Sequence, residues 1–138
     1  MTTAFVDSSA WVALIIQRDS RHARAREFMR SLTGGTRLIT SAYVVGESVT
    51  YLTYRHWRRQ ALELKSMIEA AIRINLLTLE WITPELHEMA WRTYERYDDH
   101  LFSFWDCTSF ALCSLRAIDY VFGFDSDFRT AGFDLRPQ

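Results

Sequence analysis

The sequence predicts an α/β fold in which a parallel sheet of four to five strands is covered by helices on both faces. Short apolar segments alternate along the chain with longer segments whose apolar residues recur every three or four positions. Strands that alternate with helices in this way run parallel and are buried on both faces. Composition agrees, because only 5 Gly and 2 Pro argue against a loop-rich fold or a many-turned β-sandwich.

The first half of the chain is expected to form two strands and four helices. Ser8 or Ser9 can cap the first helix, and Thr40 or Ser41 can cap the third. Gly34 and the glycine after it end the second helix. In chain order, the expected elements are a strand at Thr2–Val6, helices at 9–16 and Ser20–Leu32, a strand at Arg37–Thr40, and helices at 41–54 and Trp57–Arg73.

The second half is expected to form the remaining strands and two long helices. Thr83, Pro84 and Glu85 supply a capping hydroxyl, a proline at the first helical position and an early acid, which together mark a helix start. Ser103 caps the second of these helices. The expected elements are strands at Leu76–Leu79 and Asp119–Phe124, helices at 84–97 and 104–117, and a fifth strand at Phe133–Arg136.

Length and composition limit the class of protein. The 138 residues fit a single domain, residues 1–138, with one sizeable core. The hydrophobic content of 49% and charged content of 24% exclude a disordered chain. The longest apolar run, Ala10–Ile16, is far shorter than the roughly 20 residues that cross a bilayer, and no signal-peptide pattern is visible. We therefore expect a soluble, cytoplasmic protein with no membrane partner.

The charge is unevenly distributed, although the net charge is only −1. Residues 1–75 carry a net charge of +5 and residues 76–138 a net charge of −6. This asymmetry fits a basic surface for a polyanion beside an acidic pocket for a cation. The alternative without a functional role is that these charges lie on solvated helix faces. The candidates for a phosphate-binding rim are Arg18, Arg21, Arg55, Arg58 and Arg59.

Acidic residues fall at or near the expected ends of the strands. Asp7 ends the first strand, and Asp125 ends the fourth, with Asp127 close behind. Asp106 lies in the first turn of a late helix, and Glu47 lies about two turns into the helix after the second strand. In an open α/β sheet the active site lies outside the carboxyl ends of the strands. We therefore expect these acids to meet at one edge of the sheet.

Each acid also has a purely structural explanation. Asp7 could cap the following helix, and Asp106 could complete a capping box. Asp125 could be a turn residue, and Asp127 could be the N-cap of a short helix. Glu47 could be an ordinary exposed helix residue, although it shares its helix face with tyrosines rather than with the apolar residues expected in the core. The joint placement of the acids favours a common site.

Clustered carboxylates indicate a cation. Two of them about 4 Å apart repel by roughly 4 kcal/mol at an effective dielectric constant of about 20. Cys107 and Cys113 are expected to be buried, unpaired core residues, and no Cys/His pattern has zinc spacing. Oxygen ligands alone suit Mg²⁺ or Mn²⁺. Such a metal activates water and neutralises phosphate charge, so hydrolysis of phosphodiester bonds is the chemistry that this pattern predicts.

Four segments of the sequence resemble the PIN-domain family, and within it the VapC-type toxins of bacterial and archaeal toxin–antitoxin pairs. Their order and spacing match the family over nearly the whole chain. The segments are Phe5–Trp11 (FVDSSAW), Ile39–Glu47 (ITSAYVVGE), Phe102–Ser109 (FSFWDCTS) and Val121–Phe128 (VFGFDSDF).

The resemblance implies a three-layer α/β/α fold around a twisted parallel sheet, and an Mg²⁺-dependent endoribonuclease. By position, Asp7, Glu47 and Asp106 match the three acids that hold the metal, and Asp125 matches the fourth. Ser109 matches a hydroxyl residue about one turn after the third acid. Ser9 and Asp127 complete the candidate cofactor-binding residues. One departure is Gly123, where the family often has Thr or Ser, so that a supporting hydrogen bond is expected to be missing.

The resemblance also implies partners. VapC-type toxins usually form homodimers, cleave RNA, and are silenced by a small VapB-like antitoxin whose C-terminal segment covers the active site. Tyr43, Tyr51 and Tyr54 form a helix face that could supply such contacts, because aromatic residues are enriched in interfaces. Trp11 and Trp105 are expected to be core residues instead.

Two other phosphate-processing families need residues that this chain lacks. A haloacid-dehalogenase-like phosphatase needs a second Asp two residues after Asp7, where Ser9 stands. A phosphoacceptor receiver domain needs a Lys after a late strand, but Lys65, inside a helix, is the only Lys. The remaining alternative is a catalytically inactive PIN-like module that binds RNA or protein. The presence of all four acids argues against it.

Overall fold

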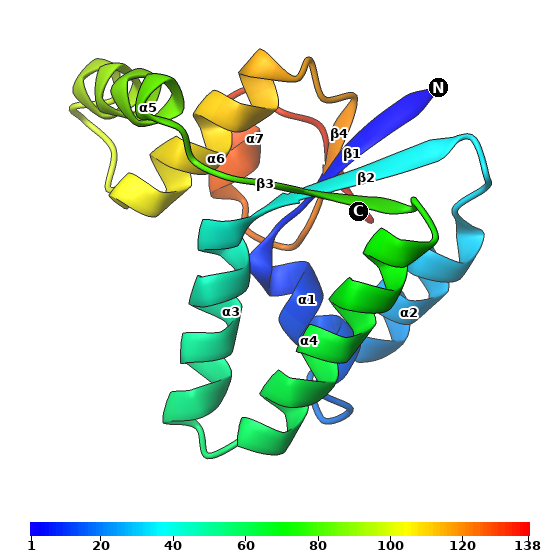
Figure 1. Ribbon diagram of the computed structural model, residues 1–138. Helices are drawn as coiled ribbons and strands as arrows, with labels where there is room; N and C mark the ends of the chain where they lie inside the picture. The colour runs from blue at the N-terminus through cyan, green and yellow to red at the C-terminus, as the bar shows by residue number, and fades with distance from the viewer.

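A five-stranded, entirely parallel sheet forms the centre of the protein, as a computed structural model of residues 1–138 shows (Figure 1). Its strand order is β3-β2-β1-β4-β5. The expected parallel sheet is therefore confirmed. The strands are β1 (Thr2–Val6), β2 (Thr36–Ser41), β3 (Leu77–Glu80), β4 (Tyr120–Phe122) and β5 (Leu135–Arg136).

Seven helices cover the two faces of the sheet and make three layers. In Figure 1, α1 to α4 lie below the sheet and α5 to α7 lie above it. The expected α/β/α arrangement is confirmed. The helices are α1 (Ser8–Ile15), α2 (His22–Ser31), α3 (Ala42–Tyr54), α4 (Arg58–Arg73), α5 (Pro84–Arg96), α6 (Phe104–Leu115) and α7 (Asp127–Thr130).

The central strand β1 lies where the strand order reverses. It pairs with β2 on one side and with β4 on the other, and the chain crosses to the second face of the sheet between β3 and β4. In a sheet of this kind the crevice opens outside the carboxyl end of the strand at the reversal point. The residue at that point is Asp7, whose backbone N–H donates to the Phe122 carbonyl at 3.0 Å.

A buried polar contact fixes the end of β1 against its neighbours. The Thr40 hydroxyl on β2 donates to the Val6 carbonyl at 2.9 Å and accepts from the Trp11 indole N–H at 3.1 Å. Trp11 is only 2% exposed, which confirms the expectation that it is a core residue. Two strands and α1 are thereby held together directly beneath the candidate site.

Several element boundaries differ from the expected ones. The N-cap of α1 is Asp7, whose carboxylate accepts from the Ser9 N–H, so that the expected Ser caps are wrong. Helix α6 ends at Leu115 rather than 117, because Ala117 has a φ of 50° and cannot continue the helix. Strand β4 is three residues long, and the chain leaves the sheet at Gly123.

The core lies on both sides of the sheet. It contains Phe5 and Phe122 from the strands, and fully burying a side chain of this size contributes about 1.5–3 kcal/mol. Cys107 and Cys113 are buried and unpaired, as expected. None of the helices is both long enough and apolar enough to cross a membrane.

Candidate active site

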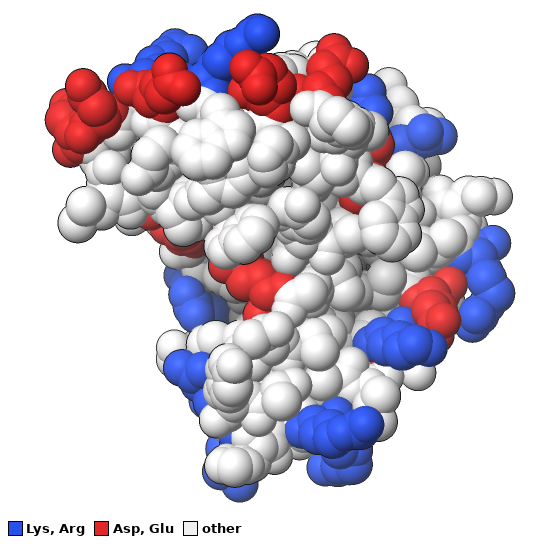
Figure 2. All heavy atoms as spheres, turned by 60° about the vertical axis from the view of Figure 1, so that its left-hand side comes forward, with Lys and Arg blue, Asp and Glu red and all other residues white.

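The five acids predicted from the sequence come from separate elements and converge on one side of the molecule. Asp7 follows β1, Glu47 lies in the middle of α3, and Asp106 lies in the first turn of α6. Asp125 follows β4, and Asp127 begins α7. Figure 2 shows acidic side chains in a hollow between the helices above the sheet and those below it. The structure thus brings residues 120 positions apart into one region.

Three of these acids form the tightest group. Carboxylate oxygens of Asp106, Asp125 and Asp127 all lie within 4.8 Å of one another, and all three residues are partly buried. Asp125 also accepts a hydrogen bond from the Asp127 backbone N–H at 2.9 Å. The N-cap of α7 is Ser126, which makes no side-chain capping bond. The alternative that Asp127 is an N-cap is therefore wrong, and its carboxylate belongs to the acidic group.

Asp7 is the most deeply buried acid, with 6% of its surface exposed. Burial raises its pKa from 3.8 to about 7, against hydrogen bonds from Ser9 that lower it, and the charge of Glu47 raises it further. Glu47 itself is exposed, on the helix face that the sequence predicted. Glu47 on α3 and Asp7 at the end of β1 are therefore close enough for their charges to interact across the hollow.

Asp106 interacts electrostatically with Asp125 on one side and with Glu47 on the other. Its pKa is raised from 3.8 to about 6, mainly by burial and then by the charge of Asp125, with Glu47 adding to the effect. Asp106 is also the partner in a complete capping box, in which the Ser103 hydroxyl accepts from its N–H at 3.0 Å. The structural explanation for Asp106 is thus correct, and it coexists with a place in the acidic cluster.

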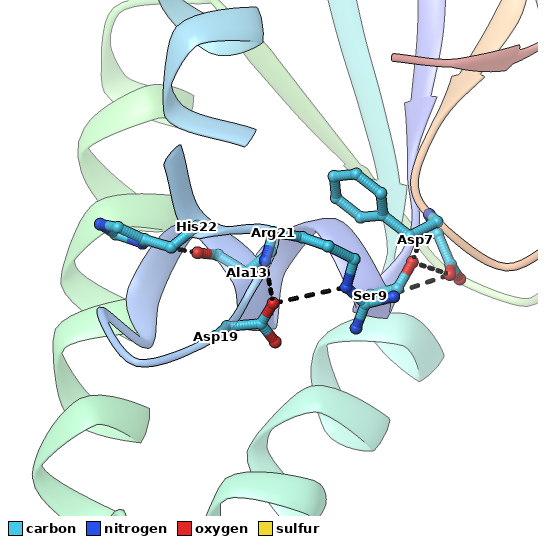
Figure 3. A network of polar contacts seen from close by, with 7 residues as sticks. Asp7, Ser9, Ala13, Asp19, Arg21 and His22 are labelled. Atoms are coloured by element: carbon cyan, nitrogen blue, oxygen red, sulfur yellow. Dashed lines mark hydrogen bonds and ion pairs between the residues drawn. The ribbon is translucent and has the colours of Figure 1, made fainter. Parts of the chain in front are cut away.

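Gly123 has no side-chain hydroxyl to support the site, and the Ser9 hydroxyl makes hydrogen bonds at this point instead. It donates to the Asp7 carboxylate at 2.9 Å and accepts from the Phe124 N–H at 2.9 Å. A Cβ atom on Gly123 would lie 3.1 Å from the Ser9 Oγ and 3.1 Å from the Asp7 Cβ. The close approach of the backbone at Gly123 therefore leaves room for Ser9 to hold Asp7. Figure 3 shows this contact.

Ser109 lies one turn after Asp106 on α6 and is buried. The hydrogen bonds of the Asp106 carboxylate and N–H go to Ser103 rather than to Ser109. The role of Ser109 in the site stays a prediction.

A small pocket with a basic side chain adjoins the acids. It has a volume of about 180 Å³ and is lined by Ser8, Ser9, Val12, Arg21, Glu47 and Tyr51. The Arg21 guanidinium lies 5.0 Å from the Phe124 ring, and its Nε lies 3.4 Å from Asp19 (Figure 3). Of the five arginines proposed for a phosphate rim, Arg21 is the one that lines this pocket. Arg18 and Arg59 line a separate pocket against α4.

Sequence reasoning missed the aromatic side of the site. Trp105, expected in the core, is 52% exposed and contacts Tyr43. The residues of α6 from Cys107 to Cys113 are all buried, whereas Trp105 lies in the first turn, ahead of this stretch, and packs against Tyr43 of α3. The order of residues in α6 does not show this, because Leu112, which lies on the same side of the helix two turns later, is fully buried.

The side chains present fit a divalent cation. The donors are carboxylate oxygens, and the pKa values of Asp7 and Asp106 are raised because burial and like charge disfavour their ionised forms. A bound cation would relieve both effects. The neighbouring thiols do not compete as ligands, because burial raises the pKa of Cys107 to about 11 and that of Cys113 well above its usual range. Oxygen-only ligation favours Mg²⁺ or Mn²⁺ over zinc.

Comparison with known proteins assigns the chain to a family whose sequence pattern covers nearly all of its residues. Residues 4–134 match the model of the PIN domain. The chain belongs to the PIN-domain family. It is 38% identical over 136 residues to the 23S rRNA-specific endonuclease VapC20 of Mycobacterium tuberculosis, covering 97% of this chain and 98% of that protein. The resemblance to VapC-type PIN domains that the four sequence segments predicted is confirmed.

Solved structures of PIN-domain proteins share the fold. The crystal structure of M. tuberculosis VapC20, a sarcin–ricin loop cleaving toxin, matches with a TM-score of 0.82 and 37% identity, over 94% of this chain and 95% of that one. VapBC2 from Rickettsia felis, solved with a promoter DNA fragment, matches with a TM-score of 0.69 and 9% identity over 98% of both chains. At this low identity the second match supports the fold alone.

Proposed function

We propose that this protein is an Mg²⁺-dependent endoribonuclease of the VapC type, which hydrolyses RNA phosphodiester bonds with water as the nucleophile. The observation that carries the proposal is the convergence of Asp7, Glu47, Asp106, Asp125 and Asp127 from four separate places in the chain. The full-length similarity to an RNA endonuclease supports it.

In this proposal Asp7, Glu47, Asp106 and Asp125 hold the metal, with Asp127 as a fifth oxygen donor. A divalent cation bound there supplies water activation and neutralises charge on the phosphate. Ser9 acts through Asp7, because its hydroxyl is bonded to that carboxylate and to the backbone after β4. Arg21 is placed to attract the phosphate backbone into the pocket beside Glu47.

The proposed partners are an RNA substrate, a VapB-like antitoxin and a second copy of the chain in a homodimer. The relative VapC20 acts on 23S rRNA, so the first RNA to test is the large ribosomal RNA. Structures of VapBC complexes from R. felis and Haemophilus influenzae share the fold. The antitoxin partner is proposed from the full-length similarity of the chain to a VapC protein. The exposed Tyr54 and Trp91 offer aromatic surface for such protein contacts.

Cleavage is expected to require a divalent metal and to leave 5′-phosphate and 3′-hydroxyl ends. Water attack in a site of carboxylates does not use the ribose 2′-hydroxyl, so no cyclic product is formed. The measurement is end-group analysis of cleaved ribosomal RNA with Mg²⁺, with Mn²⁺ and with excess EDTA. Cyclic 2′,3′-phosphate ends, or full activity in EDTA, would contradict the proposal. RNA binding without any cleavage would instead support the inactive-module alternative.

Arg21→Gln is expected to weaken RNA binding and to reduce its dependence on salt. Each phosphate contact contributes roughly 0.7 to the negative slope of log K against log salt for single strands. Arg30, an exposed residue in the last turn of α2, the helix that follows Arg21, provides a matched control when changed to Gln. The measurement is fluorescence anisotropy of a labelled RNA over a salt series. Equal slopes for Arg21→Gln and the unchanged protein would place the phosphates elsewhere.

A further inference from the structure

A second pocket adjoins the acidic cluster on the side opposite to Arg21. It lies between α3 and α6 and has a volume of about 470 Å³, within the range of pockets that bind small ligands. Glu47 lines both this pocket and the Arg21 pocket, so the two meet at one carboxylate. The residues that line the second pocket are Ala42, Tyr43, Gly46, Glu47, Thr50 and Trp105.

We propose that this pocket binds one unstacked nucleobase of the RNA substrate, against the corner that the Tyr43 and Trp105 rings form. The inference rests on the proposed ribonuclease function and adds a subsite to it. In this arrangement the backbone phosphate next to the bound base reaches the carboxylates, while the Arg21 pocket receives a phosphate on the other side of Glu47.

The two aromatic rings form a corner that suits a flat ligand. Their centroids lie 5.1 Å apart and their planes are at 86° to each other, so they do not stack on one another. Tyr43 is 38% exposed and Trp105 is 52% exposed. A base that enters the corner can stack on one ring and meet the other ring edge-on, which are the two preferred aromatic geometries. Proteins bind single-stranded RNA in the same way, by stacking bases on exposed aromatic side chains.

The polar groups of the pocket complement a base. The Glu47 carboxylate and the Thr50 hydroxyl both lie in the lining and can accept hydrogen bonds from ring or exocyclic N–H groups. No aliphatic side chain other than that of Ala42 lines the pocket. This combination of flat rings and hydrogen-bond acceptors favours a nucleobase over an aliphatic side chain of a protein partner.

The pocket is also held at a fixed position relative to the reaction centre. Trp105 directly precedes Asp106, which is fixed by the capping box at the start of α6. Tyr43 and Glu47 lie one turn apart on α3. The base and the scissile phosphate would therefore be positioned by the same two helices, which is the condition for a bound base to set the cleavage point.

Gly46 keeps this space open. A Cβ atom at Gly46 would meet no heavy atom within 4 Å, although the residue lies in the middle of α3. Glycine in a helix interior costs about 1 kcal/mol of stability relative to alanine. A side chain at this position would project into open space and shorten the pocket without disturbing the fold. Gly46→Leu is therefore a blocking variant that is not expected to unfold the protein.

The test compares base removal with ring removal. The probe is a ribosomal RNA oligonucleotide that the unchanged protein cleaves, together with copies that each carry one abasic nucleotide near the cleavage point. Removing the bound base is expected to lower kcat/KM of the unchanged protein by about 5- to 150-fold, the usual range for one stacked base. For the Trp105→Ala variant, the same abasic RNA should be cleaved with the same kcat/KM as intact RNA, because the ring that stacks on the base is already absent. Gly46→Leu should lose a similar factor on intact RNA, with an equal or higher Tm.

A second measurement reports stacking directly. With 2-aminopurine at the identified position, binding to the unchanged protein should quench fluorescence, and binding to Trp105→Ala should not. Trp81, a 70% exposed tryptophan outside the pocket, is the matched control, and Trp81→Ala should behave as the unchanged protein in both assays.

Two outcomes would overturn the inference. One is that abasic and Trp105→Ala effects multiply independently at every position of the RNA. The other is that Trp105→Ala abolishes antitoxin binding or dimer formation while cleavage of intact and abasic RNA is unchanged, in which case the pocket serves a protein partner. Failure of the unchanged protein to cleave any RNA would contradict the proposed function itself and is distinguished by that control.

Discussion

Asp7→Asn is expected to abolish RNA cleavage and, at the same time, to stabilise the metal-free protein above neutral pH. Cleavage is lost because the most buried carboxylate of the site is neutralised. Stability rises because the pKa of Asp7 is about 7 in the folded protein, mainly as a result of burial, and 3.8 when exposed. The folded state therefore holds a proton that the unfolded state releases between these two pH values.

The sign of the pH dependence follows from this difference. As the pH rises from about 4 to about 7, the unfolded state binds fewer protons than the folded state, so the free energy of unfolding falls. Above pH 7 the cost of the buried charge is fully present and amounts to roughly 4 kcal/mol. Asn removes that charge. It is as good an N-cap as Asp, so the start of α1 is preserved.

Urea unfolding in EDTA between pH 4 and pH 8 tests this expectation. The stability of Asp7→Asn should exceed that of the unchanged protein by a margin that grows up to about pH 7 and then stays constant. Asp98→Asn changes an exposed acid and should show no such margin. Mg²⁺ should narrow the gap by stabilising the unchanged protein. A margin that does not vary with pH, together with retained cleavage, would reduce Asp7 to a helix cap.

Asp125→Asn is expected to reduce cleavage severely without lowering Tm. An Asn side chain can still accept the hydrogen bond from the Asp127 N–H, so the start of α7 keeps its support, while the charge that binds the cation is lost. The loss should be at least the roughly 10- to 100-fold that removal of a metal site's outer contacts costs. Single-turnover cleavage and thermal unfolding measure the two effects separately.

Two further variants make this test specific. Asp125→Ala removes the acceptor as well as the charge, so it should lower Tm in addition to activity. Asp127→Asn should leave Tm unchanged and reduce cleavage at limiting metal, with recovery at high Mn²⁺. If Asp127→Asn is the more damaging of the two Asn variants, the main metal contact comes from Asp127.

The sequence was sufficient for the fold because each strand ends in a recognisable way. Asp7 and Asp125 each follow a short apolar segment, and parallel strands place such residues at one edge of the sheet. Periodicity likewise placed Glu47 on the exposed face of α3. These are local patterns, and they sufficed to bring distant acids into one predicted site.

Features that depend on packing between elements were not readable. Trp105 was expected in the core from its size, but whether a large aromatic residue is buried depends on which face of α6 meets the sheet. The sequence left open whether Asp127 caps α7 or belongs to the site, and the short chain after β4 places the Asp125 side chain under the Asp127 N–H instead. The Ser9 hydroxyl supplies the support that a hydroxyl at position 123 would give. This could not be predicted, because it depends on the distance between two segments that lie more than a hundred residues apart in the chain.

The distribution of the acids along the chain has a consequence for the order in which this protein is made. Asp7 is synthesised before all seven helices, whereas Asp125 and Asp127 follow the last long helix, α6. Contacts between such distant segments form only after the intervening chain has been produced and folded. A nascent polypeptide that has not passed Asp127 therefore lacks two carboxylates of the cluster, and it can already display most of its helices. Nuclease capability should thus appear abruptly, once the segment that carries Asp125 and Asp127 has been made and has folded, rather than build up with the growing chain.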